Sequence, residues 1–286
     1  MRSSFIWKLN VRKERNEINM EKHFIIAAKT DVGNCKQVNQ DSFTAKVAKT
    51  AIGEIAFAVI CDGMGGLEQG EVASTHVVKE SQRWFEQSFT KWMEQGMDQS
   101  LLMQQWKQLI DACNTQIAAY GKKEGIQVGT TATFLLLLQD MYYIAHVGDC
   151  RVYEMRNGLR QITTDQTFIE REVALGHMTK EQALNDARKN VLLQCIGVNP
   201  EVSVDYLCGK VEPDTSFLLC SDGFRHELTT EELMQYACVN LKHLNFSNAS
   251  REDMHAQMKQ QLEYLAELAK SRGEKDNLSA ILVKCI

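Results

Sequence analysis

The 286-residue sequence predicts an α+β protein in which antiparallel sheets are covered on their outer faces by helices. Three observations lead to this fold class. Short apolar runs of strand length recur along the chain, and several are joined by hairpin-like turns. Two pairs of segments with helical period interrupt these runs. A regular alternation of strand and helix, which would predict a parallel sheet, is missing.

The composition is typical of a soluble globular protein, with 44% apolar and 24% charged residues. No apolar run is long enough to span a bilayer, so no membrane association is expected. The net charge of −5 gives no field that would recruit nucleic acid. The nine cysteines are scattered and form no C-x-x-C pair, which predicts a reducing, cytoplasmic location without structural disulfides or zinc.

The first 20 residues differ from the rest of the chain. Met1–Asn19 contains five basic and two acidic residues and no apolar core of signal-peptide length. We interpret residues 1–20 as a disordered extension, or as the product of an upstream start codon with Met20 as the true beginning. No linker-like stretch divides residues 21–286, which are therefore expected to form one domain.

The first strands of this domain are Phe24–Lys29 and Ser42–Val47, on either side of the polar turn Thr30–Asp41. Next comes Ile55–Cys61, a short, continuous apolar run with three β-branched residues. A run of this kind predicts a strand buried on both faces. Asp62 follows it directly, and three glycines lie within the next four positions.

Two helices are predicted after Gly66, each from one apolar stripe with helical period. The first stripe runs from Val72 to Phe89, and the second runs from Leu102 to Ile117. Stripes of this kind dock helices on sheets, so both are expected to be core rather than a cofactor site.

Strands return at Thr130–Leu138 and Tyr142–Val147. Val152–Met155 and Leu159–Ile162 are predicted to form a hairpin, because Asn157-Gly158 between them favours a type I′ turn. The following segment, Thr163–Pro200, is predicted to be a mostly helical, polar excursion from the sheets. Within it, the sequence from Thr179 to Gln182 is a capping box that should begin a helix.

The last part of the domain is predicted to contain two strands and two helices. Phe217–Cys220 is a buried strand, and Ser279–Cys285 closes the chain as another. Thr229 and Ser250 are expected to cap helices, the second of which ends near Gly273.

Five aspartates stand at the rims of these strands, and this pattern indicates a metal site. If the strands are neighbours, their ends converge and so do the carboxylates, which would repel one another unless cations bind between them. Oxygen ligands of this kind suit Mg²⁺ and Mn²⁺ rather than zinc. The five residues are Asp41, Asp62, Asp149, Asp222 and Asp276.

The same positions lie in segments that resemble, in order, the motifs of the metal-dependent protein phosphatases, the type 2C Ser/Thr phosphatases, in their bacterial form. The resemblance covers about residues 22–286. The segments are TDVGNCKQVNQD at 30–41, DGMGG at 62–66, GTT at 129–131, VGDCR at 147–151, TTDQT at 163–167, SDG at 221–223 and DNLS at 276–279.

The resemblance implies a four-layer α-β-β-α sandwich with two central antiparallel sheets and a metal site in the cleft between them. Matched residue by residue, Asp62 would bridge two Mn²⁺ or Mg²⁺ ions. Asp222 and Asp276 would be the further ligands of one ion. Asp41 and the Gly63 carbonyl would be the further ligands of the other. Asp149 would join Asp222 at a third ion, so two or three ions per chain are expected.

The implied activity is hydrolysis of phosphoserine and phosphothreonine in proteins by a hydroxide that two cations share and that attacks phosphorus in line. Asp62 and Lys36 would be the catalytic residues. The expected partners are phosphoproteins, the substrates of a Ser/Thr kinase, and the expected role is signal transduction by a cytoplasmic monomer.

Four positions depart from the family pattern. Lys36 replaces the phosphate-binding arginine and so loses the bidentate fork, although it can hold phosphate as a point charge. Gln40 replaces an acid that often precedes Asp41. Met64 replaces the histidine of eukaryotic members and cannot donate a proton. His226 stands where many members have another acid, and it either weakens the third ion or is a surface histidine, the reading that we favour slightly.

Two other hypotheses compete with a phosphatase. One is a catalytically silent member that kept the fold as a binding or sensing module, which would be expected to have lost ligands; here all five aspartates are present. The other is a nucleotide-binding enzyme with DGMGG as a phosphate loop. It is disfavoured because the sequence lacks G-x-G-x-x-G and G-K-[ST].

Overall fold

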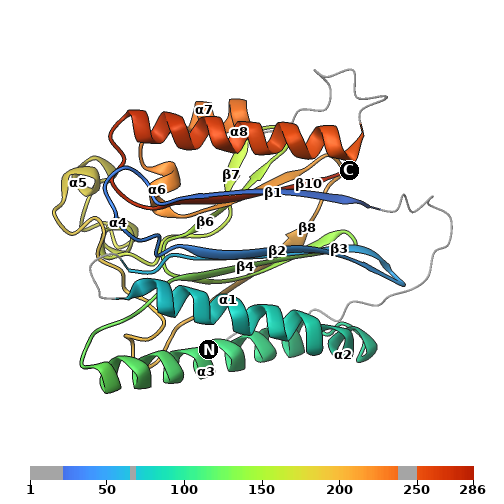
Figure 1. The fold of residues 1–286 in the computed structure, drawn as a ribbon, viewed down its shortest axis with the longest axis horizontal. Coiled ribbons are helices and arrows are strands. Elements are labelled where there is room, and N and C mark those ends of the chain that lie inside the picture. The colour runs from blue at the N-terminus through green and yellow to red at the C-terminus, as the bar shows by residue number, and fades with distance from the viewer. Residues whose placement is uncertain (1–21, 65–68, 238–249) are drawn as a thin grey trace.

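The structure is a computed structural model, and it describes residues 22–64, 69–237 and 250–286. The interpretation of residues 1–20 as an extension falls outside these ranges. Ten strands form two sheets within the described residues, and helices cover the outer face of each sheet (Figure 1). The predicted α+β sandwich with two antiparallel sheets is confirmed.

Each sheet has five strands, and all the pairs within it are antiparallel. The first sheet contains, in spatial order, β1 (Phe24–Asp31), β10 (Leu278–Cys285), β9 (Ser216–Cys220), β6 (Arg151–Met155) and β7 (Leu159–Gln161). The second contains β2 (Ser42–Thr50), β3 (Gly53–Cys61), β4 (Ala132–Leu138), β5 (Met141–Val147) and β8 (Asp205–Lys210).

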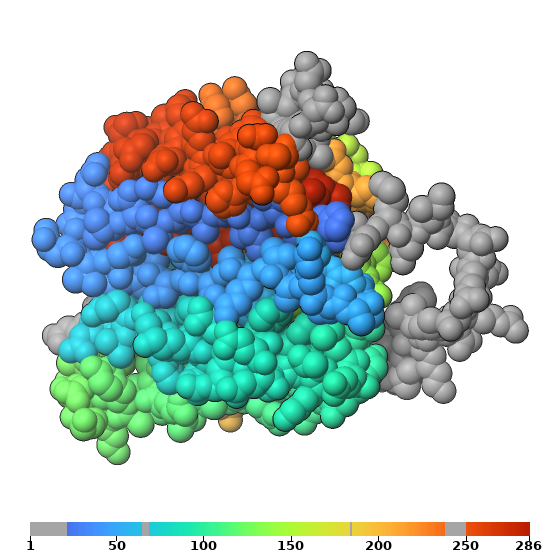
Figure 2. Space-filling model, turned by 45° about the vertical axis from the view of Figure 1, so that its right-hand side comes forward, coloured from blue at the N-terminus to red at the C-terminus, as the bar shows by residue number. Residues whose placement is uncertain are grey.

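The helices form the outer layers. Figure 1 shows α1 and α3 below the second sheet and α8 above the first, with α4 and α5 beside the left-hand strand ends. In Figure 2 the N-terminal strands form a blue band between these two helical layers. The helices are α1 (Gly70–Gln87), α2 (Phe89–Glu94), α3 (Gln99–Glu124), α4 (Phe168–Ala174), α5 (Lys180–Asn185), α6 (Asp222–Arg225), α7 (Thr230–Ala237) and α8 (Arg251–Ser271).

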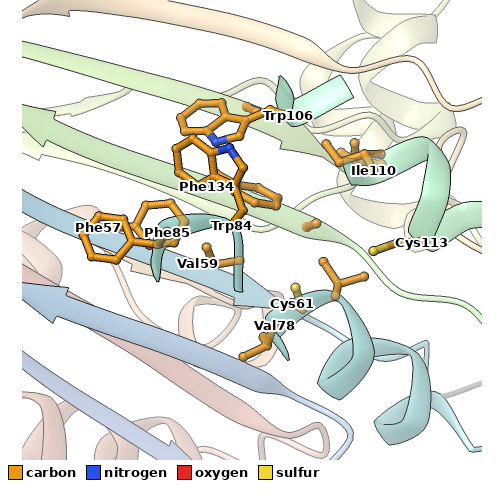
Figure 3. Close-up of a cluster of buried hydrophobic side chains, with 14 of the residues drawn as sticks. Phe57, Val59, Cys61, Val78, Trp84, Phe85, Trp106, Ile110, Cys113 and Phe134 are labelled. Carbon is orange, nitrogen blue, oxygen red and sulfur yellow. The ribbon is translucent and has the colours of Figure 1, made fainter. Parts of the chain in front are cut away.

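Strand β3 is buried on both faces, as its continuous apolar run predicts. Alternate residues from Ile55 pack against α1 and α3, while those from Ala56 pack against the other sheet. Figure 3 shows the aromatic cluster on the helix side, where the ring of Phe57 stacks on Phe85 with centroids 4.8 Å apart. This packing fixes α1 against β3, so the end of β3 and the start of α1 are held close together.

The predicted helix starts are confirmed. Thr179 and Ser250 each form a complete capping box, at α5 and α8. At α7, the Thr229 hydroxyl accepts a hydrogen bond from the Glu232 amide at 3.2 Å, and the Glu232 carboxylate accepts one from the Thr229 amide at 2.9 Å. These bonds satisfy amide groups that a helix start otherwise leaves free.

Some local predictions were wrong. The hairpin of β6 and β7 forms, but Met155 pairs with Leu159, so three residues connect the strands and neither Asn157 nor Gly158 has the positive φ of a type I′ turn. The stripe that ends at Phe89 is divided at Ser88 between α1 and α2. The excursion is mostly irregular, because α4 and α5 are only 7 and 6 residues long.

Candidate metal centre

Strand register brings the aspartates to one edge of the two sheets. In the second sheet Ser42 pairs with Cys61, so Asp41, just before β2, lies opposite Asp62, just after β3. In the first sheet Cys220 pairs with both Ala280 and Arg151. The segments with Asp222, Asp276 and Asp149 therefore leave the sheet at the same end.

A hydrogen bond joins the two halves of this cluster. The hydroxyl of Ser221, which follows β9, donates to Asp41 Oδ2 at 2.9 Å. The amide of Ser279, at the start of β10, donates to the same hydroxyl at 3.0 Å. Asp41 from one sheet is thus held against residues of the other sheet, as a site between the sheets requires.

The GTT segment holds the main chain of Asp62. The amide of Asp62 donates to Thr131 Oγ1 at 2.9 Å, and the Asp62 carbonyl accepts bonds of 2.9 Å from the Thr131 amide and from Thr130 Oγ1. Because these bonds use both main-chain groups of Asp62, they fix the direction in which its carboxylate leaves the backbone.

Two glycines allow the aspartate segments to approach closely. A Cβ at Gly63 would lie 2.6 Å from the carbonyl oxygen of Gln40, and a Cβ at Gly223 would lie 2.3 Å from that of Asn277. Both distances are far below contact distance. Neither position therefore tolerates a side chain without moving an aspartate segment.

The cluster is strongly acidic, with Asp41 and Asp149 buried and Asp62, Asp222 and Asp276 partly exposed. Burial, together with the neighbouring carboxylates, raises the pKa of Asp62 well above its usual range. Burial and the charges of Asp222 and Asp276 raise the pKa of Asp41 to about 7, although hydrogen bonds from serines oppose this shift. Burial and the charge of Asp222 likewise raise the pKa of Asp149 to about 7. The cluster needs positive charge to hold these groups ionised.

Two oxygens of the cluster also have no hydrogen-bond partner, although they are buried. They are Asp41 Oδ1 and Asp222 Oδ1. Burying a carboxylate oxygen without a partner is costly, and a hard cation is a partner that would remove this cost. Gly63 and Thr130 form an isolated antiparallel β-bridge. Its two hydrogen bonds run from the Met64 amide to the Gly129 carbonyl and from the Thr131 amide to the Asp62 carbonyl, so the Gly63 carbonyl takes no part in this pairing.

The donor set therefore fits Mg²⁺ or Mn²⁺. It consists of aspartates and the Gly63 carbonyl, without a thiolate or imidazole among the predicted ligands. In the described part of the chain no three His, Cys, Asp or Glu side chains are already drawn together around one point.

Lys36 lies in this cluster. Its Nζ is 2.9 Å from Asp276 Oδ1, and the charges of Asp62 and Asp222 also act on it. Burial alone would lower the pKa of Lys36, but the hydrogen bond to Asp276 and the acidic surroundings raise it. The ammonium group therefore supplies one of the positive charges that the aspartates need.

Other departures from the family pattern have structural roles here. The side chain of Gln40 donates to the Glu71 carboxylate at 3.4 Å, and its main-chain carbonyl, which any residue would provide, accepts bonds from the Gly63 amide at 3.1 Å and from Ser74 Oγ at 2.6 Å. His226 is half-buried, with one ring nitrogen 3.7 Å from Asp222 and the other 3.7 Å from Glu274. His226 therefore lies between the carboxylates of Asp222 and Glu274, at distances longer than a hydrogen bond.

The residue that does face Asp149 is Arg225, which the sequence analysis missed. Its Nη2 is 3.3 Å from the Asp149 carbonyl oxygen and 3.2 Å from the carboxylate of Asp165. The sequence contains one weak signal of this arrangement. Arg225 follows Asp222 by three residues, so one helical turn after Asp222 places it on the same side.

The excursion between β7 and β8 is attached beside Asp149. The main-chain amide of Gln166 donates to the Gly148 carbonyl at 2.8 Å. The side-chain oxygen of Gln166 accepts a bond from the Gly148 amide at 2.9 Å. Beyond this base the segment buries few side chains, and most of 175–190 is exposed. We refer to Thr163–Pro200 as the flap.

The other expectations from composition can be compared with the described residues. All eight described cysteines are free, and six of them are buried. Across the described ranges, no helix has both the length and the apolar character needed to cross a bilayer.

Comparison with known proteins gives consistent matches. The family model for protein phosphatase 2C matches residues 34–263. A serine/threonine phosphatase, Stp, of Listeria monocytogenes is 32% identical over 213 residues, which cover 72% of this chain and 79% of the relative. Protein phosphatase PhpP of Streptococcus pneumoniae is 25% identical over 90% of this chain and 96% of its own.

Solved structures agree with the sequence matches. Serine/threonine phosphatase Stp1 of Staphylococcus aureus superposes with a TM-score of 0.73 and 26% identity, covering 91% of this chain and 94% of its own. The catalytic domain of PstP, solved in complex with two manganese ions, has a TM-score of 0.72 and 25% identity, with coverages of 93% and 99%.

Proposed function

The chain belongs to the protein phosphatase 2C family, and we infer that it is a serine/threonine protein phosphatase, a metal-dependent hydrolase of phosphoserine and phosphothreonine in proteins. The observation that carries this function is the cluster of five aspartates with its two unpartnered carboxylate oxygens. A catalytically silent relative would have no reason to keep so many repelling charges together at one edge.

The ligand roles are part of this proposal. Asp62 would bridge two ions, with Asp222 and Asp276 on one and Asp41 with the Gly63 carbonyl on the other. Mn²⁺ or Mg²⁺ suits these oxygen ligands, and the manganese complex of PstP supports manganese. When bound, the ions supply an acidified water as nucleophile and neutralise the phosphoryl oxygens.

The protein's own residues orient the aspartate ligands and bind the substrate phosphate. Ser221 holds Asp41 in position, and Thr131 with Thr130 fixes the backbone of Asp62. Lys36 would move from Asp276 to a phosphoryl oxygen of the substrate, because a bound ion would take over the neutralisation of Asp276. Met64 has no ionisable group and takes no part in proton transfer.

Several finer assignments belong to the same proposal. The Listeria relative is a serine/threonine phosphatase by name, and this supports substrates that are products of a Ser/Thr kinase and a role in signalling. The scattered, free cysteines favour the cytoplasm. We also propose that the chain acts as a monomer.

The direct test is phosphate release from matched peptides that carry phosphoserine, phosphothreonine or phosphotyrosine, with Mn²⁺ and with excess EDTA. We expect Mn²⁺-dependent release from the first two peptides and loss of release in EDTA. Release that is unaffected by EDTA, or no release from any peptide by folded protein, would overturn the proposed function.

A further inference from the structure

Arg225 is a buried cation next to one of the proposed metal ligands. It lies on α6, three residues after Asp222, and its side chain is only 10% exposed. Its Nη2 donates to the Asp149 carbonyl at 3.3 Å, so the guanidinium lies against the segment on which a third ion is expected. A buried guanidinium needs compensating negative charge in the same place.

One acid near Arg225 is already shared with a second arginine. Asp165 accepts bonds of 2.8 Å from both Nε and Nη2 of Arg151, and Arg225 Nη2 lies 3.2 Å from the same carboxylate. Hydrogen bonds from Arg151 and the charges of both arginines keep the pKa of Asp165 below its usual value in spite of burial. Two guanidinium groups and one carboxylate leave one positive charge unbalanced.

Asp149 is the next acid near this excess charge, because its main-chain carbonyl accepts the bond from Arg225 Nη2 and the charge of Arg225 acts on its carboxyl group. Burial and Asp222 raise the pKa of Asp149, and Arg225 acts in the opposite direction on it. In addition, Arg225 Nε is buried and makes no hydrogen bond to any described group, so the guanidinium has a free donor in this region.

We propose that Arg225 supplies at Asp149 the positive charge that a third metal ion would otherwise supply, so that this chain binds two ions and not three. The proposal rests on the proposed metal centre, and it concerns only the number of ions and the role of Asp149. A dication placed between Asp149 and Asp222 would have to approach a fixed guanidinium that is bonded to the Asp149 carbonyl, and like charges repel.

The test is the number of Mn²⁺ ions bound per chain, measured on the full-length protein by equilibrium dialysis with metal analysis and by electron paramagnetic resonance of free Mn²⁺. We expect two ions in the wild type. Arg225→Gln, which removes the charge, should gain a third ion, with binding of the third equivalent tightened by roughly tenfold or more. Arg225→Lys, the matched control that keeps the charge, should still bind two.

Asp149→Asn provides a second measurement that does not depend on the folding of Arg225→Gln. In the wild-type background it should leave the count at two, because Asp149 holds no ion there. In the Arg225→Gln background it should reduce the count from three to two. Circular dichroism and thermal melting of each variant verify that the counts refer to folded protein.

Different failures have different meanings. A wild type that binds three ions and loses one in Asp149→Asn would overturn the role of Arg225 but leave the phosphatase intact. A count of two in folded Arg225→Gln, with KM raised about tenfold, would overturn the proposal and make Arg225 a phosphate contact. A wild type that binds no Mn²⁺ would instead contradict the proposed function.

Discussion

A carboxylate lies near each end of strand β3, and the two ends differ in how that charge is compensated. At its start, Glu54 is 2% exposed and accepts bonds from Arg251 at 2.8 and 3.1 Å and from the Phe24 amide at 3.0 Å. Just beyond its other end, Asp62 is surrounded chiefly by the charges of further aspartates.

The electrostatic outcome is opposite at the two ends. The partners of Glu54 outweigh its burial and lower its pKa to about 2. Burial and like charges raise the pKa of Asp62 well above its usual range. The fold therefore supplies its own counter-charge where a carboxylate is structural. Where it does not, it leaves a place for cations from solution.

The largest expected difference is in catalysis. Asp62→Asn should lower Mn²⁺-dependent turnover of p-nitrophenyl phosphate by about three orders of magnitude or more, because a charged bridging ligand is lost. Glu54→Gln is the matched control on the same strand and should keep turnover within a few-fold of wild type. Near-normal turnover in folded Asp62→Asn would contradict the distinction between a structural carboxylate at Glu54 and a metal-binding carboxylate at Asp62.

Lys36 sharpens the comparison, because it is a cation that the chain itself provides at the aspartate end. Lys36→Ala should raise KM by roughly tenfold and lower kcat less, since a contact to the substrate phosphate is lost. Lys36→Arg should be tolerated or improve KM. An unchanged KM in the alanine variant would show that Lys36 only pairs with Asp276.

The flap lies beside the aspartate end but is expected to act on substrate choice. Its tip is mostly exposed, whereas its base is bonded to Gly148. A segment that buries little opens at low free-energy cost and can gate access without doing the chemistry. Substitutions in Gly176–Asp186 should keep p-nitrophenyl phosphate turnover within a few-fold of wild type and change phosphopeptide turnover more strongly.

The informative outcome for the flap is the ratio of the two activities. Equal losses on the small substrate and on the phosphopeptide would mean that Gly176–Asp186 supports the metal centre, and the gating role would be wrong.

The smallest effect is on stability at the Glu54 end. Glu54→Gln should lower the free energy of unfolding at pH 7 by about 1–3 kcal/mol, because Arg251 loses its charged partner. A carboxylate with a lowered pKa stabilises the fold above its ordinary value of 4.5, and this contribution disappears as pH falls towards 2.

Urea denaturation of wild type and Glu54→Gln between pH 3 and 7 measures this contribution. The difference between the two proteins should be largest at pH 7 and should shrink below pH 4.5. A constant difference across this range would mean that the charge of Glu54 is not the cause.

Much of the fold was predictable from local signals. The run Ile55–Cys61 is apolar at every position because β3 is packed on both faces, and the caps at Thr179 and Ser250 depend only on residues within one turn. By contrast, β8 is an edge strand that is largely exposed, so it lacks the apolar signal that marks the other strands.

The site was predictable only in part for a related reason. Each aspartate could be placed at a strand end from the sequence, but their convergence depends on pairings such as that of β1 with β10, which local patterns do not contain. The position of Arg225 depends on Asp149 and Asp165, 76 and 60 residues away. A sequence motif covers only a short stretch of the chain, so it cannot connect groups at such separations.

Thermal unfolding in EDTA and in saturating Mn²⁺ tests most directly the claim that the aspartate end is built to be neutralised by metal. Wild type should melt several degrees higher with Mn²⁺, since binding at about 100 times Kd contributes about 2.7 kcal/mol. Asp62→Asn in EDTA should melt at or above wild type, because one repelling charge is gone, and it should lose most of the Mn²⁺ shift. A wild type that Mn²⁺ does not stabilise, together with an Asp62→Asn variant that melts lower than wild type in EDTA, would contradict the account.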